Sequence, residues 1–145
     1  FLFPALLSGL LAASLAGARA WAFRAPSQAE LAAILRTSEC EGERVAAVDG
    51  LAGEPGARDA IAAALSDRSD AVRFAAAIAL AIADDSSGLD VLLARADDES
   101  ADVRKRAIMA LSLFKTPAAR QRVERAAAED PDPSVKELAR SLRTR

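Results

Sequence analysis

The chain has 145 residues, enough for one domain with a modest core. Hydrophobic residues make up 52% of it but aromatic residues only 4%, so Ala, Leu, Val and Ile dominate, which predicts an all-α fold of closely approaching helices. The net charge of −2 comes from interleaved acidic and basic residues without a basic tract, which excludes nucleic acid as a partner.

Residue types that carry chemistry are scarce. The chain contains no His, the commonest general base and metal ligand, and its single cysteine, Cys40, provides neither a disulfide nor a thiol cluster. We expect Cys40 to be a partly buried small residue. Three acidic pairs stand where helices are predicted to break, so we expect solvated loop and cap residues rather than catalytic carboxylates: Asp84-Asp85, Asp97-Asp98 and Glu129-Asp130. The sequence therefore predicts a protein that is not an enzyme and holds no metal or cofactor.

The chain begins with an apolar segment. Residues 1–18 read FLFPALLSGLLAASLAGA and carry no charge, and a run of this length can nearly cross a bilayer. Ala18-Arg19-Ala20 has the small-x-small form that signal peptidase accepts, and Ala16-Gly17-Ala18 is a second candidate. We therefore interpret residues 1–20 as a signal peptide or a retained membrane anchor, truncated at its start, and residues 21–26 as a linker.

This interpretation predicts an exported protein, periplasmic or lumenal, that meets a membrane only through residues 1–20 if they are not cleaved. The alternative is that the segment forms a buried first helix of the fold. Pro4, Gly9 and Gly17 disfavour this alternative, because proline and glycine are poor residues for a soluble core helix.

Next in chain order, a helix is predicted from Ser27, because Ser27 and Glu30 form a capping-box pattern before Leu31. A nine-residue pattern then recurs about every thirty residues. A basic residue holds its second position and Ala its fifth, and Leu ends it, although the last copy is one residue shorter: residues 43–51, 72–80, 103–111 and 135–142. Apolar residues four apart, such as Val72, Ala76 and Leu80, indicate a helix with one apolar face.

Polar residues stand before the last three of these helices. Ser69, Ser100 and Asp132 are the predicted N-caps, with Pro133 at the first helical position. Shorter second helices follow polar or Gly/Pro breaks and are predicted at residues 57–65, 89–96 and 118–128. The sequence thus predicts an α-α superhelix, or solenoid, of about three to four helical hairpins over residues 27–145, with repeats at 27–42 (partial), 43–68, 69–99, 100–130 and 131–145 (partial).

The recurring Asp-x-x-x-x-Val-Arg, then Ala, then Leu, resembles the short HEAT repeats first named from phycobilisome lyases. The resemblance covers residues 27–145 and implies an outer row of first helices and an inner row of second helices. The inner row would line a concave face, which in that family usually holds a partner protein. Repeats of this kind specify a fold far more than a function.

Mapped onto that inner row, the expected partner-binding residues are Asp59, Ala62, Ala63, Asp90, Leu93, Ala94, Gln121, Glu124 and Arg125. Such a mixed surface with an apolar middle suits a protein or peptide partner. We therefore predict a non-catalytic scaffold for protein–protein interaction. The alternative, suggested by the resemblance, is a chromophore lyase-like protein or a chaperone of cofactor attachment, which needs more repeats and a deeper pocket. Hydroxylase chemistry, as in HEAT enzymes with a His-Glu metal site, is excluded by the absence of His.

Overall fold

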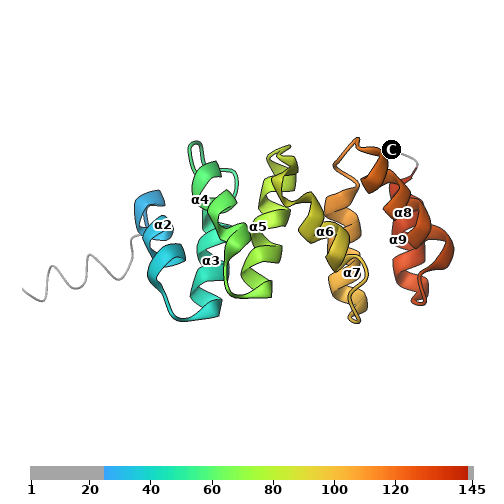
Figure 1. Cartoon of the computed structure of the whole chain (residues 1–145), viewed down its shortest axis with the longest axis horizontal. Coiled ribbons are helices and arrows are strands. Elements are labelled where there is room, and N and C mark those ends of the chain that lie inside the picture. The colour runs from blue at the N-terminus through green and yellow to red at the C-terminus, as the bar shows by residue number, and fades with distance from the viewer. Residues whose placement is uncertain (1–24, 144–145) are drawn as a thin grey trace, which may run out of the picture.

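The computed structural model describes residues 25–143, and within this range the regular elements are α-helices and two short 3-10 helices, Ala64–Ser66 and Ser86–Gly88. The predicted all-α solenoid is confirmed (Figure 1). Its α-helices are α2 (Gln28–Thr37), α3 (Glu41–Leu51), α4 (Arg58–Ala63), α5 (Asp70–Ile82), α6 (Leu89–Arg95), α7 (Ala101–Leu111), α8 (Pro117–Glu129) and α9 (Pro133–Leu142).

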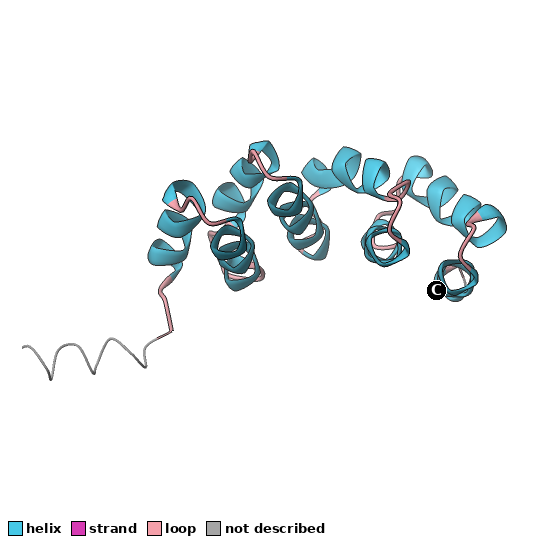
Figure 2. Cartoon of the chain, turned by 90° about the horizontal axis from the view of Figure 1, so that it is seen from below, coloured by secondary structure: helices cyan, strands magenta, loops and turns pink. Residues whose placement is uncertain are grey.

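The helices form two rows along an arch, as Figure 2 shows. The helices that carry the recurring pattern, α3, α5, α7 and α9, follow the inner side of the arch, and α2, α4, α6 and α8 follow the outer side. The expected assignment of rows is therefore wrong, because the second helices lie on the outer side. Ala75, Ala76 and Ala79 are buried along α5, and their small size allows neighbouring helices to approach α5 closely.

Capping residues set most helix starts as predicted. Ser27 and Glu30 form a complete capping box, and Ser69 and Asp132 accept hydrogen bonds from the first turns of α5 and α9. Ser100 precedes α7 as predicted, but its side chain makes no capping hydrogen bond. The Ser100 N–H donates to the carboxylate of Asp98 at 2.9 Å. Cys40 precedes α3 and is exposed, so the expectation that it is partly buried is wrong.

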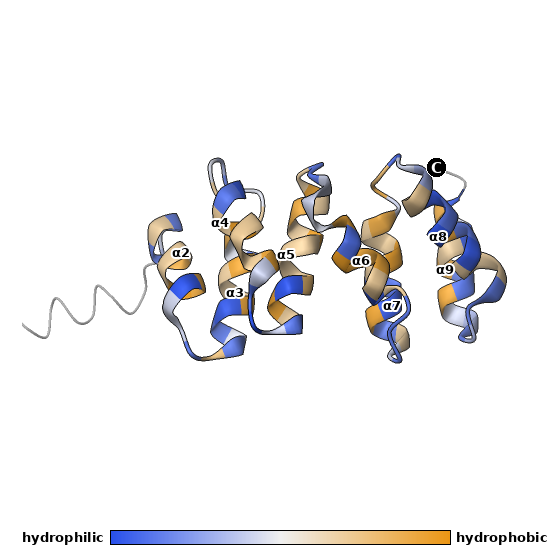
Figure 3. Ribbon diagram, viewed as in Figure 1, coloured by the Kyte–Doolittle hydropathy of each residue, from blue (hydrophilic) through white to orange (hydrophobic). Residues whose placement is uncertain are grey.

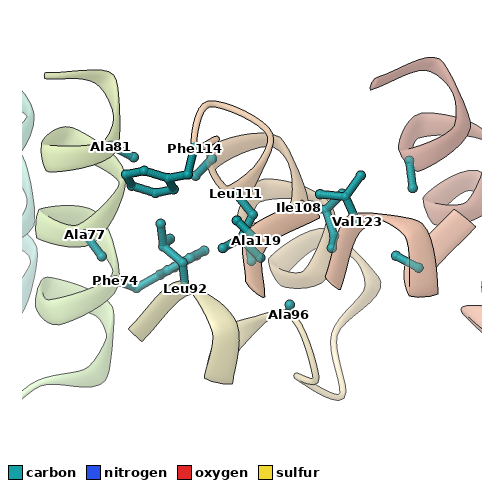
Figure 4. Close-up of a cluster of buried hydrophobic side chains, with 14 of the residues drawn as sticks. Phe74, Ala77, Ala81, Leu92, Ala96, Ile108, Leu111, Phe114, Ala119 and Val123 are labelled. Carbon is teal, nitrogen blue, oxygen red and sulfur yellow. The ribbon is translucent and has the colours of Figure 1, made fainter. Parts of the chain in front are cut away.

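Two hydrophobic clusters form the core, and α5 contributes to both. Val72, Ala76 and Leu80 pack with α3 and α4, whereas Phe74, Ala77 and Ala81 pack with α6 and α7. In the second cluster the Phe114 side chain reaches back toward Ala81 (Figure 4). Helix α5 therefore joins the two halves of the solenoid, because its opposite faces pack into different hydrophobic clusters.

Gly88 allows α6 to start close against α5. A Cβ atom added at Gly88 would lie 2.6 Å from the Cα and 2.8 Å from the Cβ of Ala77, far inside van der Waals contact. These are backbone and first-carbon atoms, which cannot turn aside as the end of a long side chain can. The separation of α5 and α6 therefore depends on glycine at this position.

Replacing Gly88 by Ala should lower the free energy of unfolding by about 1 to 3 kcal/mol, because the two helices must separate. Urea denaturation of the purified protein measures this. Gly42→Ala is the matched control: Gly42 is exposed on α3, its added Cβ would meet only the Cys40 Sγ at 3.9 Å, and alanine favours the helix. Equal stabilities for the two variants would contradict the close approach.

Candidate protein-binding face

Two arginines of the recurring pattern are buried and tie consecutive turns together. Arg104 donates from Nε and Nη2 to the carboxylate of Asp130, at 3.0 and 2.9 Å, and from Nη1 to the carbonyls of Asp98 and Glu99, both at 2.9 Å. The turn before α7 is thereby joined to the turn before α9. We call this arrangement an arginine clamp.

The same clamp occurs two repeats nearer the N-terminus. Arg44 donates from Nε and Nη2 to Asp67, at 2.9 and 3.0 Å, and from Nη1 to the carbonyls of Ser38 and Glu39, at 2.9 and 3.1 Å. The exposed fraction of the Arg44 side chain is only 4%. The clamp arginines therefore stabilise the repeat stack and do not offer their charge to a ligand.

The central repeat departs from this arrangement. Arg73 donates to the carbonyl of Asp67 at 2.6 Å and pairs with Asp70, whose side chain is 63% exposed. Asp98, the counterpart of Asp67 and Asp130, is instead bound by Arg95, with an Nη1–Oδ2 distance of 2.8 Å. The junction between α5 and α7 is therefore held without an arginine clamp.

Two opposing effects act on the pKa of the buried Asp130 carboxylate: its desolvation, and its hydrogen bonds and ion pairing. Burial alone would raise the pKa of this carboxyl, but hydrogen bonds from Arg104 and from the Asp132 N–H, with the positive charges of Arg104 and Arg122, hold its pKa below the ordinary value. The expectation that all three acidic pairs are solvated is wrong here, because Asp130 is 6% exposed. An aspartate is kept ionised in the interior by a partner that the sequence pattern placed 26 residues away.

The expected partner-binding residues all lie on helices of the outer row. The predicted position of these residues on the concave side is therefore wrong. They are distributed over three helices: Asp59 and Ala62 on α4, Asp90 and Leu93 on α6, and Gln121, Glu124 and Arg125 on α8. The structure brings together only part of this group: a groove between α6 and α8 is lined by Leu93, Gln121, Glu124 and Arg125. Arg125 pairs with Glu129 at 3.3 Å. The visible side of α8 is largely hydrophilic (Figure 3).

An apolar groove lies instead between the inner-row helices α5 and α7. It has a volume of about 280 Å³ and is lined by Ile78, Ile82, Arg106, Met109, Ala110 and Leu113, and we call it the inner groove. Ile82, Met109 and Leu113 are 65%, 52% and 50% exposed. These three are the large hydrophobic side chains that stand exposed in residues 25–143. The exposed large hydrophobic side chains of residues 25–143 are therefore gathered at one place.

The recurring pattern itself carries a signal for this groove. Its seventh position is occupied by Asp49, Ile78, Met109 and Ser141 in successive copies. Asp49 and Ser141 show that this position is solvent-facing in the outer copies, where a polar residue is ordinary. Isoleucine and methionine at a solvent-facing position of the two central copies mark a surface that a partner would cover.

Arg106 is the one charged residue that lines the inner groove. Its guanidinium carbon lies 5.1 Å from the ring centre of Phe74, close enough for a cation–π interaction. Its near neighbour Lys105 pairs with Asp102 at 3.5 Å, whereas none of the ion pairs formed within residues 25–143 includes Arg106. The groove thus combines apolar walls with one cationic end.

The described part of the chain has no helix that is both long and apolar enough to cross a bilayer. The predicted leader, residues 1–20, lies outside the described residues. Among residues 25–143 no group of three or more cysteine or acidic side chains is arranged to hold a metal ion.

Comparison with known protein families gives a match for HEAT repeats. Residues 29–107 match the HEAT-repeat family model, and residues 83–143 match it a second time, so the two matches overlap and together cover the solenoid. A comparison with curated proteins gives no match.

Replacing a clamp arginine should destabilise the protein far more than replacing Arg73, the arginine at the same position of the pattern that forms no clamp. Arg104→Met leaves the Asp130 carboxylate buried without its partner, so the free energy of unfolding should fall by about 3 kcal/mol. Arg73→Met is the matched control, since its ion pair is largely solvated and should contribute less than about 1 kcal/mol. Urea denaturation measures both. Similar losses would mean that the clamp contributes no more than a surface ion pair.

Proposed function

Because the chain belongs to the HEAT-repeat family, whose repeats typically mediate protein–protein interaction, we propose that it is a non-catalytic scaffold that binds a partner protein along the inner groove. The observation that carries this proposal is the gathering of Ile82, Met109 and Leu113 in one groove between α5 and α7. The proposed surface is on the concave side, as expected, but belongs to the other row of helices.

The exposure of these side chains supports a binding role on energetic grounds. Fully burying a large aliphatic side chain contributes about 1.5 to 3 kcal/mol. Ile82, Met109 and Leu113 keep 65%, 52% and 50% of their surface in water, so a partner that covers them gains a large share of this free energy. Methionine is unbranched and flexible, so Met109 can adapt to the shape of a partner. An apolar centre with a polar surround is the usual construction of a protein interface, and Asp49 and Ser141 provide polar positions on the flanking inner helices.

The proposal that the scaffold is not an enzyme rests on its residue types. The sequence has no His, and the acidic residues expected at helix breaks serve as caps and ion-pair partners where they are described: Asp85 accepts from Ser87, Asp98 from Ser100, and Asp130 from Arg104. No specific observation favours the alternative of a chromophore lyase-like protein or a chaperone of cofactor attachment.

Binding should depend on the inner groove and not on the outer face. Affinity capture with the wild-type chain, followed by mass spectrometry, identifies the partner, and Ile82→Asp with Met109→Asp should lower its recovery at least tenfold, since two charges would be buried against apolar surface. Both side chains are exposed, so the helical circular-dichroism signal should not change.

The matched control reverses two exposed charges of the outer row, Asp90→Lys with Arg125→Glu. This variant should recover the partner as the wild type does. If it loses the partner while the groove variant keeps it, binding occurs on the outer face and the proposed surface is wrong.

We also propose that the scaffold acts outside the cytoplasm, on the strength of the uncharged apolar run over residues 1–18 and the small-x-small sites that follow it. When the chain is expressed in a bacterial host with a start codon and basic residues added upstream, the expected outcome is export with cleavage after Ala18 or Ala20. N-terminal sequencing of the exported product tests this. Export without cleavage would indicate a retained anchor, and an intact cytosolic protein would contradict export.

A further inference from the structure

We propose that the occupant of the inner groove is an amphipathic helix of a partner protein that carries a carboxylate one turn from its apolar contacts and pairs it with Arg106. This inference rests on the proposed function and adds the chemistry of the partner. It follows from three features of the groove: its lining residues have helical spacing, its one charged residue forms no ion pair within residues 25–143, and no acidic residue lines it.

The walls of the groove have helical spacing on each side. Ile78 and Ile82 are four residues apart on α5. Arg106 and Met109 are three residues apart on α7, and Leu113 follows four residues later, in the turn after this helix. The groove therefore runs along the two helices, and its apolar positions repeat about every 5 to 6 Å, one helical turn. Apolar side chains at positions i and i+4 of a partner helix have the same repeat.

The charge at the end of the groove is held in place but not neutralised. The guanidinium carbon of Arg106 lies over the ring of Phe74, and a cation–π interaction of this kind adds no negative charge beside the guanidinium. Phe74 is 5% exposed and packed in the core, so its ring has a fixed position against which the Arg106 side chain lies. Arg106 lies three residues, or about 5 Å along the axis, before Met109. A carboxylate one turn from the partner's apolar contacts would meet it there.

Other occupants match the groove less well. Residues 1–24 of the chain are apolar but contain no Asp or Glu and carry Arg19 and Arg24, so they would bring positive charge toward Arg106. A second copy that places the same groove against this one would supply apolar side chains and another Arg106, since no acidic residue lines the groove. An acidic amphipathic helix satisfies both the apolar walls and the charge.

The test uses the full chain and fluorescein-labelled synthetic helical peptides of about 15 residues, long enough to form stable turns. Each peptide carries Leu at positions i and i+4 and, one turn before or after them, Glu, Gln or Lys. Fluorescence anisotropy should give the tightest binding for a Glu peptide, about fivefold tighter than its Gln counterpart, as expected for a partly exposed ion pair.

Arg106→Gln should remove the preference for Glu over Gln, and Arg106→Glu should transfer it to the Lys peptide. Arg120→Gln is the control, because Arg120 is exposed on α8 of the outer row and should leave the preference unchanged. Ile82→Asp should weaken every peptide alike. Together these results would establish an acidic amphipathic helix as the ligand class.

Four outcomes would overturn the inference. They are equal binding of the Glu and Gln peptides, a preference that survives Arg106→Gln, tighter binding of a synthetic peptide of residues 1–24, and self-association in sedimentation that Ile82→Asp abolishes. The first two leave the proposed function standing if the captured partner still requires Ile82 and Met109. Loss of that requirement would refute the function as well, so the two failures can be told apart.

Discussion

Each clamp arginine must replace the water that its guanidinium loses on burial, and the local geometry supplies hydrogen-bond acceptors in its place. Arg104 makes four hydrogen bonds, two to the carboxylate of Asp130 and two to carbonyls in the turn before its own helix. A planar cation that binds two turns at once fixes their separation and their relative orientation. Because Arg44 repeats the arrangement with Asp67, the spacing of consecutive hairpins at both ends of the solenoid follows from one interaction.

The centre of the solenoid is held differently, and the inner groove lies at that place. Asp98 is bound by Arg95, so the contact between α5 and α7 depends on apolar packing around Phe74, while Gly88 permits the close approach of α6 to α5. The side chains that fill this junction are on the α6 side of the two helices, and Ile82 and Met109 remain exposed on the inner side. The repeat junction that lacks an arginine clamp is therefore also the one that carries the surface proposed for binding.

Local signals in the sequence accounted for most of the fold. The capping box at Ser27, the caps at Ser69 and Asp132, and the buried positions Ala76 and Ala107 are all as the pattern predicts, because each depends on neighbours within one or two turns. The sides of the arch could not be read in this way. Both rows are amphipathic, and the direction of curvature depends on the difference in spacing between the rows, which no single helix encodes. The expected site residues were therefore placed on the concave side although their helices form the outer row. Asp130 was taken for a solvated residue because its partner, Arg104, belongs to a different helical hairpin.

The clamps also bear on how quickly the chain can fold. Arg44 and Asp67 are 23 residues apart in the sequence, and Arg104 and Asp130 are 26 apart, so even the interactions that join repeats close only short loops. The entropy lost on closing such loops is small, and every helix packs mainly against helices one or two places away along the chain. A topology of this kind has a low contact order and folds fast. It needs no single nucleus, since a hairpin formed at either end provides the surface on which its neighbour can assemble.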